Sequence, residues 1–133
     1  MADDEVRTRL DGEELLRCVP PTFVDKEYSM SEPSPRVFWP RADDDGQLSV
    51  DRENLRSAEE SYKHRIEVLK LATAGVLAVS TDDVASVDLS AYAQPLVDND
   101  AHAVVDFRPR LGDKSIREIL LKRALERGWR FVP

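Results

Sequence analysis

Two short apolar runs, each bounded by turn-forming residues, constrain the fold of this chain more than any other feature. The first is Val76-Leu77-Ala78-Val79, which follows Gly75 and precedes a Ser-Thr-Asp-Asp stretch. The second spans residues 102–107 and contains two consecutive valines. The uninterrupted apolar run at residues 76–79 is typical of a strand buried on both faces, and the valine pair within residues 102–107 favours a second strand. We therefore predict a central strand at residues 76–79 and another strand at residues 102–107.

Two capping-box patterns predict where the main helices begin. Ser57 is followed three residues later by Glu60, and Ser115 is followed by Glu118. In this pattern the serine oxygen accepts a backbone hydrogen bond from the first turn, and the glutamate accepts one from the serine amide. Apolar residues recur at helical spacing after both starts, and Gly128 lies where a left-handed C-cap residue belongs. The expected helices cover about residues 57–72 and 115–127.

The other segments carry shorter elements and loops, predicted from alternation, capping residues and prolines. They are a short helix at residues 11–19, paired strands at 37–39 and 47–50, a short helix within 81–89, a loop at 94–100 and a terminal strand at 129–132. Together the elements predict an α+β fold in a single domain of residues 1–133, with two main helices packed on a small mixed or antiparallel sheet of four to five strands. Residues 1–10 are expected to be a flexible acidic N-terminus, and residues 20–35 a proline-containing loop.

The composition argues against several classes of function. The formal net charge of −7 disfavours unspecific nucleic-acid binding. Cys18 is the only cysteine, so no internal disulfide can form, and its apolar neighbours favour a buried thiol over a reactive one. The N-terminus lacks the basic start and apolar stretch of a secretory signal, and no apolar run is long enough to span a bilayer. We expect a cytoplasmic protein without membrane contact.

No metal or cofactor site is completed by the motifs. Asp43-Asp44-Asp45-Gly46 has the composition of a calcium loop, but aligning the glycine places Arg41 and Arg52 where carboxylate ligands are needed. A solvated turn whose acids pair with arginines explains it better. No phosphate-binding glycine motif and no Gly-x-Ser-x-Gly pattern is present. We therefore predict no metal and no cofactor.

The charge is distributed unevenly along the chain, and this predicts an interaction surface. Residues 1–14 carry six acidic and two basic side chains, whereas residues 108–130 carry eight basic and three acidic ones. The asymmetry fits either contact with a partner or internal pairing between the acidic and basic regions. The candidate surface comprises Lys114, Arg117, Lys122, Arg123, Arg127 and Arg130, with Trp129 or Phe131 available for stacking on a nucleic acid.

A second candidate site is polar and consists of Ser49, Arg52 and His102. The histidine begins a predicted strand after an Asp-Asn-Asp turn, at a sheet edge where sites commonly open. It can serve as a base or as a hydrogen-bond donor to a ligand, or it can simply hold the preceding loop. His64, on the polar side of its predicted helix, is expected to face solvent.

Part of the chain resembles a family of small, uncharacterised bacterial proteins. The shared segments are Phe38-Trp39-Pro40, Leu-Ser-Val-Asp-Arg at 48–52, Gly-Val-Leu-Ala-Val at 75–79 and Ala-His-Ala-Val-Val at 101–105. The resemblance covers about residues 36–107 and implies no activity, so no catalytic residue is carried over from it.

Three functions of different classes follow from these observations. The favoured one is a non-enzymatic, partner-binding or accessory protein of a multi-component bacterial system, such as a toxin-antitoxin or defence locus, because no catalytic motif is complete and the charge is polarised. The alternative is a small enzyme or ligand-binding domain, such as a nucleotide-dependent transferase, with its site near Ser49, Arg52 and His102. The third is nucleic-acid contact through the basic C-terminal helix. The sequence leaves the oligomeric state open.

Overall fold

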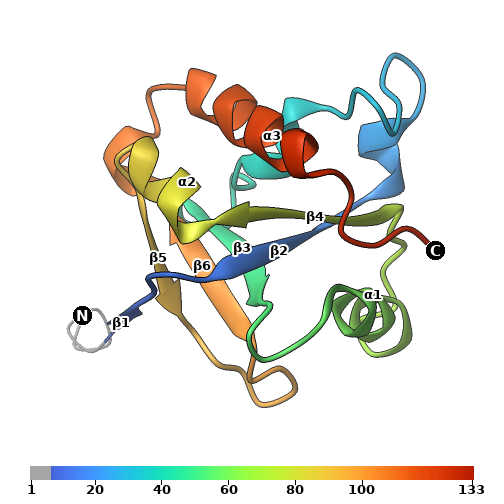
Figure 1. The fold of residues 1–133 in the computed structure, drawn as a ribbon, viewed down its shortest axis with the longest axis horizontal. Helices are drawn as coiled ribbons and strands as arrows, with labels where there is room; N and C mark the ends of the chain where they lie inside the picture. The colour runs from blue at the N-terminus through green and yellow to red at the C-terminus, as the bar shows by residue number, and fades with distance from the viewer. Residues whose placement is uncertain (1–6) are drawn as a thin grey trace.

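The computed structural model describes residues 7–133, which form six strands, three α-helices and three short 3-10 helices (Figure 1). The strands are β1 (Thr8–Arg9), β2 (Glu14–Val19), β3 (Gln47–Arg52), β4 (Gly75–Ser80), β5 (Ser90–Ala93) and β6 (His102–Asp106). The α-helices are α1 (Ala58–Glu67), α2 (Thr81–Ser86) and α3 (Ser115–Arg127), and the 3-10 helices are η2 (Pro21–Val24), η3 (Pro35–Phe38) and η4 (Arg108–Arg110).

All six strands join one antiparallel sheet in the order β1-β5-β6-β3-β2-β4. The predicted α+β character is confirmed. The expected count of four to five strands is too low, because β1, β2 and β5 were not predicted as strands. The short helix predicted within residues 81–89 is present as α2 and joins the two main helices as a third α-helix. The segment predicted as flexible, residues 1–10, begins outside the described residues; within its described part, Thr8 and Arg9 pair with Ala93 and Tyr92.

The helices cover the two faces of the sheet unequally. In Figure 1, α2 and α3 lie on one side of the sheet and α1 lies on the other. The face under α2 and α3 carries the larger hydrophobic core, which includes Leu48 from β3 and Leu120 from α3. A smaller cluster, built on Leu16 and Ala58, joins α1 to β2 and β4. On this second face, α1 packs mainly against β2 and β4, and Ser49 of β3 is exposed.

β4 is fully buried as predicted, but it is an edge strand and not a central one. Its free edge is closed by the C-terminal tail. Val76 donates a 2.9 Å hydrogen bond to the carbonyl of Phe131 and accepts one of 2.8 Å from Arg130. The predicted terminal strand at residues 129–132 is thus reduced to one bridge. Gly75 permits the close approach, since a Cβ there would lie 2.9 Å from the Phe131 oxygen.

Two local predictions were wrong, one because of tertiary packing and the other because of a local helix cap. The segment predicted as a helix at residues 11–19 contains β2. Its Leu15 and Leu16 point to opposite faces of the sheet, and both faces are covered at this position. Consecutive apolar residues are therefore compatible with a strand here. Residues 37–39, predicted as a strand, lie at the end of η3, where Ser34 accepts a hydrogen bond from the amide of Arg36 and a proline occupies the first turn.

The capping-box predictions had different outcomes. At α1 the box is confirmed, with Ser57 and Glu60 making both hydrogen bonds. At α3 it is wrong: the helix is present, but Ser115 is its first residue and its hydroxyl donates to Asp113 instead. A further box, between Ser80 and Asp83, begins α2. Among the helices of residues 7–133, none has the length and apolar character needed to cross a bilayer.

The sheet has a gap between β2 and β3 that positions the candidate site. Only Leu15 and Leu16 of β2 pair with β3, opposite Arg52 and Asp51. Beyond them the two strands separate. The side chain of Arg17 fills the gap, donating hydrogen bonds of 2.9 Å to the carbonyl of Val37 and 3.1 Å to that of Ser49. A side chain thus satisfies carbonyls that a continuous ladder would otherwise pair with amides.

Candidate functional site

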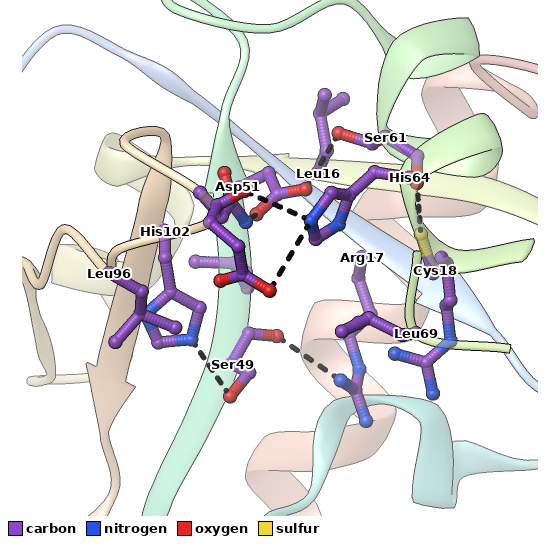
Figure 2. Close-up of a pocket in the computed structure, with 14 residues that line it drawn as sticks. Leu16, Arg17, Cys18, Ser49, Asp51, Ser61, His64, Leu69, Leu96 and His102 are labelled. Carbon is purple, nitrogen blue, oxygen red and sulfur yellow. Dashed lines mark hydrogen bonds and ion pairs between the residues drawn. The ribbon is translucent and has the colours of Figure 1, made fainter. Parts of the chain in front are cut away.

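A cleft of about 250 Å³ opens on the face of the sheet that α1 packs against, between β2, β3, α1 and the loop that connects β5 to β6. Polar and ionisable side chains from all four segments line it. Figure 2 shows them converging: His102 and Leu96 border one side of the cleft, whereas Arg17, Cys18 and Leu69 border the other. The cleft brings together residues that lie up to about 85 positions apart in the chain, so it depends on the complete fold.

Ser49 and His102 are hydrogen-bonded to each other within this cleft. The distance between the serine Oγ and the histidine Nε2 is 3.2 Å, and the histidine Nδ1 lies 2.9 Å from the carbonyl oxygen of Gln94. A carbonyl can only accept, so Nδ1 carries the hydrogen in the neutral imidazole. The Nε2 lone pair then accepts the hydrogen of the serine hydroxyl (Figure 2). His102 therefore both holds the preceding loop and binds the serine.

Asp51 ties the three walls of the cleft together. Its Oδ2 accepts a 2.7 Å hydrogen bond from the hydroxyl of Ser61 on α1, and its Oδ1 accepts one of 2.8 Å from the side-chain amide of Asn99. The side-chain oxygen of Asn99 in turn accepts a hydrogen bond from the backbone amide of Ala101, the residue immediately before His102. Both donors to Asp51 are buried, so the carboxylate is fully engaged and fixes the loop next to the histidine.

Two arginines bring positive charge into the cleft without a matching ion pair. Arg17 and Arg65 both line it, and no carboxylate of residues 7–133 forms a salt bridge with either of them. Burial, followed by repulsion from Arg65, lowers the pKa of Arg17 to about 10. The Nε atom of Arg65 is buried and has no hydrogen-bond partner within the described chain. Uncompensated guanidinium groups of this kind favour the binding of an anion.

Two other titratable side chains of the cleft are already satisfied. His64 was predicted to face solvent, and this is wrong: its side chain is only 10% exposed. Its Nε2 lies 3.1 Å from the carbonyl oxygen of Asp98. Cys18 lies against α1, with its thiol 3.8 Å from the carbonyl of Ser61, and burial raises the pKa of the thiol to about 11. The prediction of a protonated, unreactive cysteine fits this environment.

The third predicted site residue lies elsewhere. Arg52 points to the opposite face from Ser49 and forms a two-pronged pair with Glu13, at 2.8 and 2.9 Å. It does not line the cleft. The reason is the two-residue period of a strand, which places residues 49 and 52 on different faces. The structure therefore brings Ser49 and His102 together and leaves Arg52 out.

The acidic turn before β3 forms as predicted, with its carboxylates paired to arginines. Arg41 pairs with Asp44 at 3.2 Å, and Arg108 lies 3.9 Å from Asp45. Asp45 and the following glycine both have positive φ angles, which suits a tight turn. Within residues 7–133 there is no cluster of three potential metal ligands.

The six cations of the predicted interaction surface are distributed over α3 and the tail that follows it. Three of them pair with acids of the described chain: Arg127 with Asp83, Arg130 with Glu14, and Arg123 with Glu126. The other three, Lys114, Arg117 and Lys122, lie on α3 or immediately before it. Arg123 and Glu126 both belong to α3, so pairing between the acidic and basic regions of the chain accounts for two of the six cations, Arg127 and Arg130.

Sequence reasoning missed most of the residues that build the cleft. One signal was available: Arg17 interrupts the apolar run of β2, and a charged residue inside such a run requires a specific partner. The Asp-Asn-Asp turn predicts only a loop from its composition, but its Asn99 is 6% exposed and makes two side-chain hydrogen bonds.

Comparisons of the chain with protein-family models, with curated proteins and with solved structures gave no match.

Proposed function

We propose that this protein is a ligand-binding domain whose cleft between β2, β3 and α1 holds a small organic anion. The observation that carries the proposal is the pair of guanidinium groups, Arg17 and Arg65, which share the cleft without a salt-bridge partner among the described residues. Placing two like charges in a partly enclosed site costs free energy, and an anion between them would recover it.

The other polar groups of the cleft support an organic ligand over a simple inorganic ion. Ser49 and His102 offer a hydroxyl and an imidazole to the same cleft, and Figure 2 shows Ser49 between His102 and Arg17. Leu69 and Leu96 add apolar surface at the rim, and they are 42% and 46% exposed. A volume of about 250 Å³ lies at or below the low end of the range for small-molecule sites. The combination suits a metabolite-sized carboxylate or phosphate ester.

The proposal is tested by thermal unfolding of the full chain with citrate, succinate, acetate and inorganic phosphate at constant ionic strength. We expect at least one organic anion to raise the melting temperature saturably, as binding to the folded state requires. Replacing Arg65→Gln should weaken this binding roughly tenfold or more, since one charge-assisted hydrogen bond is removed. Arg123→Gln on the outer side of α3 is the matched control.

Two results would count against an anion site. The first is a shift that never saturates, because it would indicate a general salt effect. The second is an equal loss of binding in Arg65→Gln and Arg123→Gln. Arg65 is preferred to Arg17 for the test because it makes no side-chain hydrogen bond within the described chain, so its replacement should leave the fold intact.

Partner binding, the function favoured from the sequence, is a second candidate supported by a different observation. Exposed apolar side chains occur after the end of α1 and on the β5–β6 loop, and two of them, Leu69 and Leu96, line the cleft. These apolar side chains are Val68, Leu69, Leu71, Leu96 and Val97. Affinity capture from the native host tests this candidate when wild type is compared with Val97→Glu. Recovery of the same proteins with both would argue against it, as would recovery of the bait alone.

A further inference from the structure

The hydrogen-bonded chain Gln94–His102–Ser49 has the form of an activated nucleophile. The carbonyl of Gln94 fixes the tautomer of the imidazole, so the Nε2 lone pair is directed at the serine hydroxyl. A base oriented by a third group and bonded to a hydroxyl is the arrangement that nucleophilic catalysis needs. Ser49 is exposed at the cleft, so a substrate can reach its oxygen.

The surroundings of the serine add the other requirement, a positive charge for a developing oxyanion. Arg17 donates a 3.1 Å hydrogen bond to the backbone carbonyl of Ser49, which places its guanidinium beside the strand segment that bears the hydroxyl. Figure 2 shows Ser49 between His102 on one side and Arg17 on the other. A fixed cation at this position stabilises negative charge that forms on a substrate oxygen.

We propose that Ser49 is a nucleophile with His102 as its general base, and that the cleft hydrolyses small carboxylic esters that carry a negative charge. The reaction class follows from the hydroxyl–imidazole pair. The choice of a charged substrate rests on the proposed function, since it uses the anion site at Arg17 and Arg65.

The reaction proceeds in two balanced steps. In the first, the Oγ of Ser49 bonds to the ester carbonyl carbon and its proton passes to Nε2 of His102; the bond to the alcohol oxygen breaks, and the alcohol leaves with that proton. In the second, water attacks the acyl-serine and gives its proton to Nε2, which returns it to Oγ as the acid is released. The net reaction consumes one ester and one water and yields one acid and one alcohol, with no oxidant or metal.

The closing experiment uses a neutral fluorophosphonate ester on the full chain, followed by intact mass and peptide mapping. Such a probe forms a bond from phosphorus to an activated serine oxygen and releases fluoride, while the serine proton passes to the base. We expect labelling at Ser49 that is abolished by Ser49→Ala, slowed roughly 100-fold or more by His102→Gln and unchanged by Ser31→Ala in a distant loop. Circular dichroism of each variant verifies folding.

The outcomes separate this inference from the ligand site. A probe without charge does not need Arg65. Labelling of Ser49 that persists while Arg65→Gln and wild type bind anions equally poorly would therefore remove the anion site and keep the nucleophile. Anion binding without labelling, or labelling of Ser49 that His102→Gln leaves unchanged, would overturn the nucleophile. A serine with a purely structural role would not react with the probe in the wild type.

Discussion

The side-chain amide of Asn99 donates a 2.8 Å hydrogen bond to the carboxylate of Asp51, joining two residues that are 48 positions apart in the chain. The oxygen of the same side-chain amide accepts a hydrogen bond from the backbone amide of Ala101. The buried side chain of Asn99 thereby forms hydrogen bonds both with β3 and with the loop, and these bonds fix the residue before the start of β6.

This contact predicts a large effect of Asn99→Ala. The replacement leaves the backbone amide of Ala101 and one oxygen of Asp51 without their partner in a buried setting. We expect a loss of about 2–3 kcal/mol in the free energy of unfolding, measured by urea denaturation. Asn54→Ala is the control, since Asn54 is exposed in a turn, and a change of similar size there would contradict the explanation.

Gly75 predicts how strongly the C-terminal tail is fixed to β4. In Gly75→Ala the new Cβ meets the carbonyl of Phe131 and the ring of Trp129, both at 2.9 Å, so the tail must move away from the edge strand. We expect about 1–3 kcal/mol of destabilisation by thermal unfolding. Gly112→Ala is the control variant, because a Cβ at Gly112 would have no atom within 4 Å. Equal effects of the two would show that the tail bridge adds no stability.

Asp83 predicts a dependence of stability on acid pH. Burial acts to raise the pKa of its carboxyl, but hydrogen bonds from Arg127 and from the amide of Ser80 outweigh it and lower the pKa below its ordinary value. The folded state therefore favours the carboxylate. Its stabilisation is complete above the unfolded pKa of about 4 and is lost as pH falls through the lower folded value.

Replacing Asp83→Asn should accordingly cost about 2–3 kcal/mol at pH 7, and the difference from wild type should shrink as the pH is lowered below 4. Asp82→Asn, in the same first turn of α2 but exposed, should change stability by no more than about 0.5 kcal/mol. Urea titrations from pH 2 to 7 measure both. A difference that does not vary with pH would assign the effect to packing and not to charge.

Cys18 predicts slow alkylation of the native protein. With burial raising the pKa of its thiol to about 11, the thiolate fraction at pH 8 is on the order of 100-fold smaller than for an exposed thiol. Iodoacetamide should react correspondingly more slowly with folded protein than with protein unfolded in guanidinium chloride. The folded rate should continue to rise up to about pH 11. A plateau below pH 9 would show that the thiol is accessible and ordinary.

The sequence predicted those elements whose residues decide their own structure. The apolar runs located β4 and β6, and the capping box at Ser57 located α1, because burial and capping act over a few neighbouring residues. β5 was missed because Ser-Ala-Tyr-Ala is short and lacks β-branched residues; it is a strand only because β1 and β6 pair with it on both sides.

The candidate site was only partly predictable for the same physical reason. Ser49 and His102 were selected one by one from their positions on expected strands, and the β3–β6 register brings them together. The contribution of Arg17 follows from the separation of β2 and β3, which no local pattern encodes. Arg52 shares the predicted segment with Ser49, but the alternation of the strand directs it to Glu13 on the other face.

The strand order has a consequence for the order of events during synthesis. Apart from two residue pairs with β3, β2 finds its ladder only in β4, where Glu14 lies opposite Ser80, and β1 finds its partner only in β5, where Thr8 lies opposite Ala93. As the chain leaves the ribosome, β2 can form its ladder with β4 only after residues 75–80 have been synthesised, and β1 can pair with β5 only after residues 92 and 93. The edge of β4 is closed last, by Phe131. We expect the nascent chain to present unpaired strand edges until β4, β5 and β6 have been synthesised, and the sheet to close cooperatively after that point.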